Sequence, residues 1–88
     1  MKEYSKVIYG KYLRVQKSED CLLLNLYVDN NWIKSSNSLD NIRGEVFELL
    51  LNRLYEVSLG QVVLKSEIIE CYYKTELFVA CFKQKLES

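Results

Sequence analysis

The chain has 88 residues and a mass of 10.4 kDa, which leaves room for one domain and excludes a second independent core. Hydrophobic residues make up 49% and aromatic residues 12% of the chain, enough to form a core and to exclude an intrinsically disordered protein. Twelve basic residues balance twelve acidic ones, so a strongly basic surface for nucleic acid or membranes is excluded as a bulk property.

Several residue types that carry chemistry are absent or sparse. Histidine is absent, which removes the commonest general base and metal ligand. The three cysteines form no CxxC pair, so we expect no metal site, and their odd number favours free thiols in a reducing cytoplasm. The longest apolar run, residues 77–82, is too short to span a membrane. These features predict a cytoplasmic protein without a cofactor, and enzymatic activity is the least supported class.

The first third of the chain shows the two-residue alternation of strands. Residues 22–29 show a period of two over eight positions, with Leu22, Leu24, Leu26 and Val28 alternating with Leu23, Asn25, Tyr27 and Asp29, as in a half-buried strand. One parity of residues 7–15 is also mostly apolar, and Asn30-Asn31 suits a tight hairpin turn. The pattern predicts a three-stranded antiparallel meander within residues 1–35, in which Trp32 anchors the sheet to a helix.

Residues 36–88 form a predicted helical unit of the same single domain, 1–88. Serines at 35, 36 and 38 are N-cap candidates for a helix over 39–58, and Gly60 is placed to terminate it. In the last third, apolar residues recur at helical spacing, and Lys74-Thr75-Glu76 is expected to divide them into two helices. A two-strand hairpin, 67–73 and 77–83, is the alternative. The predicted fold class is therefore α+β, an antiparallel meander followed by three helices.

Two segments of this helical unit carry a family resemblance. Glu45-Val46-Phe47-Glu48-Leu49-Leu50-Leu51 lies in the first predicted helix, and Gly60-Gln61-Val62-Val63-Leu64-Lys65-Ser66-Glu67-Ile68-Ile69-Glu70 follows it. Together with Phe82-Lys83-Gln84-Lys85-Leu86-Glu87 they resemble the OmpR/ToxR-type winged-helix DNA-binding domain of transcriptional regulators. The likeness covers roughly residues 12–87 and is most specific over 45–87. The family's C-terminal wing has no counterpart before Ser88.

The resemblance implies a helix-turn-helix unit that binds double-stranded DNA in transcriptional control. Helix 76–87 would read the major groove, with Lys83 and Lys85 on phosphates and Gln84 at a base edge. Thr75, at the start of that helix, completes the predicted DNA-binding set. The alternative function is a small protein-interaction module or inhibitor that keeps the scaffold without binding DNA, with a protein partner or a second copy as its ligand. Neutral charge and the missing wing favour this alternative.

Overall fold

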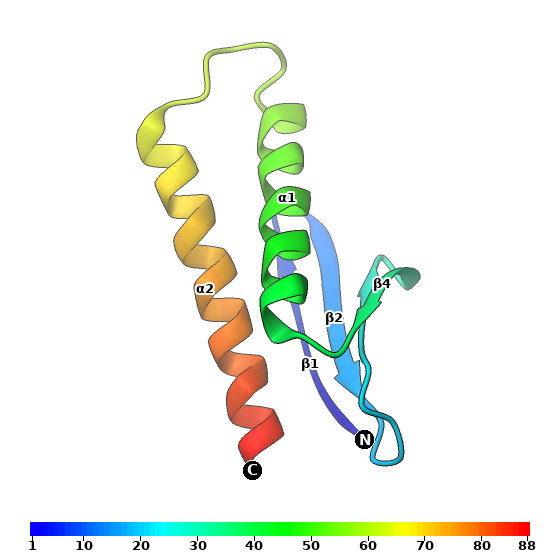
Figure 1. Cartoon of the computed structure of the whole chain (residues 1–88). Helices are drawn as coiled ribbons and strands as arrows, with labels where there is room; N and C mark the ends of the chain where they lie inside the picture. The colour runs from blue at the N-terminus through cyan, green and yellow to red at the C-terminus, as the bar shows by residue number, and fades with distance from the viewer.

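Four antiparallel strands come first in the chain and two helices follow, as the computed structural model of residues 1–88 shows (Figure 1). The elements are β1 (Lys2–Ile8), β2 (Lys11–Lys17), β3 (Leu24–Val28), β4 (Asn31–Ser36), α1 (Leu39–Val57) and α2 (Lys65–Glu87). The strands lie in the order β1-β2-β3-β4, so each strand pairs with its neighbour in sequence. This confirms the α+β class and the antiparallel meander at the N-terminus.

The sheet has one hairpin more than the sequence pattern predicted. Tyr9 and Gly10 form a two-residue turn with φ of 51° and 78°, and Asp29 and Asn30 form a second with φ of 50° and 68°. Turns with two positive φ values match the right-handed twist of the strands they join. The first turn divides the predicted first strand in two. Even-numbered residues face the helices before the turn and odd-numbered residues face them after it, so Val7 and Leu13 lie on opposite faces of the sheet.

Both helices cover the same face of the sheet (Figure 1). The strands contribute alternate apolar residues to this face, and the central ones, Leu13, Val15 and Leu26, are fully buried. Helix α2 lies along β1, whereas α1 lies over β3 and β4. The core is therefore a single layer between a sheet and a helical hairpin.

Helix α1 forms where the sequence predicted it. The Ser38 hydroxyl accepts a hydrogen bond from the Asn41 backbone N–H at 3.3 Å and caps the helix. A stripe of residues four apart is buried against the sheet and α2: Ile42, Val46, Leu50 and Leu54. The helix ends at Val57, and Leu59 and Gly60 then turn the chain with positive φ, 54° and 82°.

The prediction of three helices, and with it the helix-turn-helix unit, is wrong because α2 is one continuous helix over 23 residues. Residues 74–76 contain neither proline nor glycine, and the Lys74–Glu70 ion pair (3.5 Å) joins the first of them to the preceding turn of the helix. Thr75 is only 1% exposed, and its hydroxyl donates to the Cys71 carbonyl at 3.0 Å. Cys71, Thr75, Phe78 and Phe82 follow one another at helical spacing on a single buried face, so packing against the rest of the core keeps the helix unbroken.

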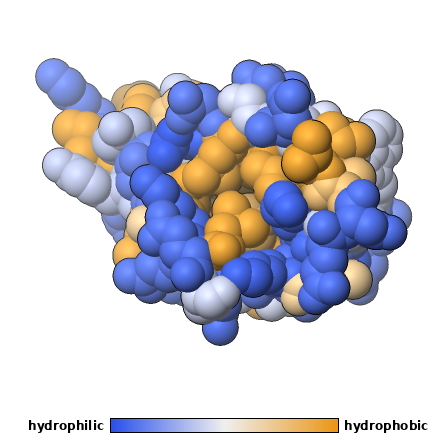
Figure 2. Space-filling view, turned by 60° about the horizontal axis from the view of Figure 1, so that its bottom comes forward, coloured by the Kyte–Doolittle hydropathy of each residue, from blue (hydrophilic) through white to orange (hydrophobic).

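The two termini lie at the same end of the molecule (Figure 1). Lys2 Nζ donates to the backbone carbonyls of Leu86, at 2.9 Å, and Ser88, which ties β1 to the C-terminal end of α2. Figure 2 looks toward this end and shows an apolar area bordered by hydrophilic residues. Met1 and Leu22 are 66% and 81% exposed, and the Met1 ammonium lies 3.5 Å from Glu19, so Met1 and the turn that precedes β3 are adjacent.

Candidate functional site

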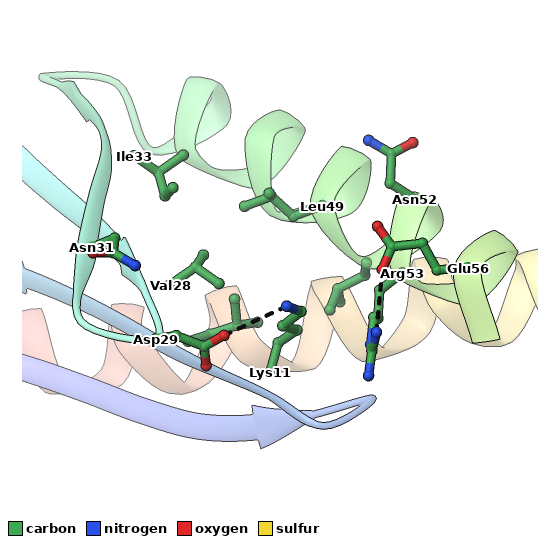
Figure 3. Close-up of a pocket in the computed structure, with 11 residues that line it drawn as sticks. Lys11, Val28, Asp29, Asn31, Ile33, Leu49, Asn52, Arg53 and Glu56 are labelled. Carbon is green, nitrogen blue, oxygen red and sulfur yellow. Dashed lines mark hydrogen bonds and ion pairs between the residues drawn. The ribbon is translucent and has the colours of Figure 1, made fainter.

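A cleft of about 320 Å³ lies between α1 and the adjoining ends of β2, β3 and β4 (Figure 3). Val28, Ile33 and Leu49 line it with apolar side chains. Its charged residues are engaged with one another: Lys11 Nζ lies 3.5 Å from Asp29, and Arg53 donates to Glu56 at 3.1 Å. The cleft therefore offers a ligand an apolar wall and a rim of paired charges.

Two of these charged side chains hold the hairpin turns. Asp29 Oδ1 accepts a hydrogen bond from the Tyr12 backbone N–H at 3.0 Å. This bond, with Lys11 and Arg53 nearby, lowers the pKa of the Asp29 carboxyl. Arg53 Nε donates to the Tyr9 carbonyl at 2.9 Å, which connects α1 to the β1–β2 turn. Both groups stabilise the fold, and neither is an unpartnered acid or base.

The four residues predicted to bind DNA divide into two groups. Lys83, Gln84 and Lys85 are exposed near the C-terminal end of α2. Thr75 is buried, and its hydroxyl is bonded to the Cys71 carbonyl, so it faces the core rather than solvent. The three exposed residues stand on a single long helix, without the preceding short helix that sets the angle of a recognition helix on DNA.

The face of the sheet that the helices leave uncovered is rich in aromatic and polar side chains. We call it the open face, and strand register assigns to it residues 3, 5 and 7 of β1, 12, 14 and 16 of β2, 25 and 27 of β3, and 32 and 35 of β4. These residues are Glu3, Ser5 and Val7 of β1, Tyr12, Arg14 and Gln16 of β2, Asn25 and Tyr27 of β3, and Trp32 and Ser35 of β4. Its only charged members, Glu3 and Arg14, have opposite sign.

Hydrogen bonds and ring contacts join the side chains of the open face. Arg14 donates to Glu3 at 3.3 Å and to Gln16 at 3.0 Å, and its guanidinium carbon lies 4.3 Å from the centroid of the Tyr27 ring. Gln16 Nε2 donates to the Tyr27 hydroxyl at 3.3 Å. These contacts fix rotamers that would otherwise be mobile, so part of the entropy cost of binding is met in the free protein.

Trp32 stands on the open face and is 61% exposed. The prediction that it anchors the sheet to a helix is wrong, because the hairpin pairs it with Tyr27 on the face away from the helices. Its indole N–H donates to the Ser35 hydroxyl at 2.8 Å, and the Ser35 hydroxyl in turn bonds to Asn25 Oδ1 at 2.5 Å. The turn forms at Asp29-Asn30, one residue before the Asn30-Asn31 turn predicted from the sequence, and pairs Tyr27 with Trp32. The signal was in the sequence, because a two-residue turn at either place puts Trp32 on the face opposite Leu24 and Leu26.

No three His, Cys, Asp or Glu side chains come close enough together to hold a metal ion. Neither helix combines the length and the apolar character that a bilayer span requires. The chain matches no protein-family model, no curated protein and no solved structure.

Proposed function

We propose that this protein is a binding module, not an enzyme, and that it binds a partner protein through the open face of its sheet. The observation that carries the proposal is a Trp that is 61% exposed beside Tyr27 and Arg14 on a face that no part of the chain covers. Trp, Tyr and Arg are the residue types in which interface hot spots are enriched. The polar atoms of these side chains are bonded to neighbours on the same face, and Arg14 lies over one face of the Tyr27 ring, which leaves the Trp32 ring as the most available for contact.

The charge of the open face supports a protein partner over a nucleic acid. Glu3 and Arg14 lie 3.3 Å apart and cancel, so the face carries no surplus of positive charge for a phosphate backbone. Its other members are hydroxyl, amide, apolar and aromatic side chains. Tyr and Trp with Ser and Asn are also the composition of antibody binding sites, which recognise proteins with rigid aromatic anchors and adaptable polar contacts.

Binding to double-stranded DNA through α2 is the second candidate function. The exposed side chains of Lys83, Gln84 and Lys85 support it. The two candidates differ in their expected response to salt. Two lysines on phosphates would give affinity that falls as salt rises, whereas contacts on a neutral aromatic face are nearly independent of salt.

The three cysteines bear on the compartment. Cys21, Cys71 and Cys81 are all free thiols. Free thiols support the cytoplasm as the location, since a reducing compartment preserves them.

A quantitative affinity purification from source cells tests the proposal. Tagged wild-type protein, Trp32→Ala, Tyr27→Ala and a matched control, Leu59→Ala, serve as baits, because Leu59 is 87% exposed and lies outside the sheet. We expect a specific partner retained by the wild type and the control and lost by both aromatic variants. Calorimetry with the purified partner should then show at least about a tenfold weaker affinity for Trp32→Ala, the size of a hot-spot loss.

Two results would overturn the proposal. One is a partner retained equally by Trp32→Ala and the wild type, provided that circular dichroism shows both to be folded. The other is a mobility shift of duplex DNA that weakens with salt and with Lys83→Ala, with no protein partner. That result would establish the DNA candidate in its place.

A further inference from the structure

The solvent-facing side of α2 is apolar where the outer side of a surface helix is normally charged. Successive residues of a helix are about 100° apart, so positions 66, 69, 73, 77, 80 and 84 lie opposite its buried residues. We call this set the outer stripe; its members are Ser66, Ile69, Tyr73, Leu77, Ala80 and Gln84. None of these six is charged, the same side continuing to Glu87 only in the last turn of α2, and Ile69, Tyr73 and Leu77 are 45%, 66% and 56% exposed.

The outer stripe is only partly covered by the rest of the chain. Helix α2 stands at one side of the molecule, with α1 and the sheet on its other side (Figure 1). The contacts of α2 with α1 run through residues beside the stripe: Tyr72 packs edge-on against Phe47, and Glu76 lies 3.0 Å from Arg43. Tyr73 also packs edge-on against Tyr72, and Leu77 borders a small pocket beside β1, yet more than half of each of these side chains remains in contact with solvent.

We propose that the outer stripe is covered by the α2 helix of a second copy of this chain, packed antiparallel about a two-fold axis near Leu77. Such an interface is isologous, so each contact between two different residues occurs twice. With Leu77 beside its own symmetry mate, Tyr73 lies opposite Ala80 of the second copy and Ile69 opposite Gln84. The large Tyr73 ring meets the smallest side chain of the stripe, which lets the two helices approach each other.

The charges beside the stripe fit the same register. Lys65 at the start of α2 lies opposite Glu87 of the second copy, because the two ends of the helix carry opposite charges on the same flank. Glu76 comes near its own symmetry mate at the axis, but Arg43 of the same chain lies 3.0 Å from its carboxylate and offsets that repulsion. A second copy therefore satisfies both the size and the charge pattern.

This proposal is independent of the one made for the open face. The helices cover one face of the sheet, so the outer stripe belongs to α2, whereas the open face lies on the side of the sheet away from both helices. A dimer through α2 would present two open faces, so that a partner with two copies of the recognised surface would bind with avidity.

Sedimentation equilibrium of the wild type, Leu77→Glu and the control Leu59→Glu over a wide range of concentration tests the dimer. We expect the wild type to rise from 10.4 kDa to twice that mass. Leu77→Glu places two like charges at the axis and should weaken association at least about a hundredfold. Leu59→Glu adds the same charge to an exposed apolar residue in the loop between the helices and should dimerise as the wild type does.

Cysteine pairing tests the antiparallel register without depending on stability. In a Cys21→Ser, Cys81→Ser background, which removes the two partly exposed native thiols, a mixture of Tyr73→Cys and Ala80→Cys should give a mixed disulfide dimer under mild oxidation, in preference to either self-linked product. A wild type that stays monomeric throughout overturns the proposal, as does a dimer unaffected by Leu77→Glu. Preferential self-linking of Tyr73→Cys, or a dimer lost in Trp32→Ala, also overturns it by placing the interface elsewhere.

Discussion

Two glycines with the same open surroundings but different backbone conformations should respond in opposite directions to alanine. Gly44 lies within α1 and Gly60 follows it with φ of 82°, and a Cβ atom added at either would meet no atom within 4 Å. Space is therefore equal at the two sites. Alanine also restricts the unfolded chain similarly at both positions. The difference between the two variants reports the backbone conformation alone.

Gly44→Ala should stabilise the protein by about 0.4–1 kcal/mol, because alanine suits the helix and limits the unfolded chain. For a domain of this size that raises the Tm by about 2–8 °C. Gly60→Ala should destabilise it by about 1–2 kcal/mol, the cost of a Cβ in the left-handed region. Urea denaturation gives the free energies of unfolding, and thermal unfolding followed by circular dichroism gives the Tm values.

A stabilising Gly60→Ala would refute the reasoning, because it would mean that the chain does not turn with positive φ after α1. A destabilising Gly44→Ala would refute it in the other direction, since it would place a neighbouring atom or a non-helical backbone at residue 44. Equal shifts for both variants would show that effects on the unfolded chain outweigh the folded geometry.

Three further predictions follow from α2, Asp29 and the buried thiol. Thr75→Pro should lower the free energy of unfolding by about 3 kcal/mol or more, because it interrupts a helix interior, whereas Lys65→Pro at the first helical position should be tolerated. Urea denaturation compares the two variants. A tolerated Thr75→Pro would mean that the helix is broken near residue 75. The pKa of Asp29 is lowered from 3.8, so the stability that its carboxylate contributes is present above pH 3.8 and is lost as the pH falls through the folded-state pKa. The difference in unfolding free energy between the wild type and Asp29→Asn should therefore shrink in acid. A difference that stays constant with pH would contradict the lowered pKa. Cys71 is fully buried, and burial raises the pKa of its thiol. An alkylating reagent should therefore modify Cys71 after Cys21 and only as fast as the protein unfolds, which mass spectrometry can follow. Early modification of Cys71 would show that α2 opens locally.

The fold was predictable from the sequence where local chemistry and burial agree. The alternation over residues 22–29 predicted β3, whose Leu24 and Leu26 are buried and whose Tyr27 stands on the open face. Ser38 predicted the start of α1 because a hydroxyl can cap the helix without help from distant residues. These features depend on neighbours in sequence, and the pattern alone contains them.

The candidate site was predicted less well because it depends on strand pairing. Trp32 was recognised as a notable residue but assigned to the wrong face, since its side depends on the register that the β3–β4 turn imposes on β4. The turn at Tyr9-Gly10 was missed for a related reason. One parity of residues 7–15 is largely apolar, which resembles a single long strand until the positive φ of both turn residues divides it.

The sequence by itself determined the α+β class, the antiparallel meander at the N-terminus and the position of α1, because capping, turn chemistry and periodicity act over a few residues. Only the tertiary structure decided that residues 65–87 form one helix, because Lys74-Thr75-Glu76 is locally compatible with a break and with continuity. Burial of Thr75 between Cys71 and Phe78 selects continuity, since a break there would expose a core that extends to Phe82. The same packing sets the direction of the opposite side of α2, and so brings Ile69, Tyr73 and Leu77 together in one exposed stripe.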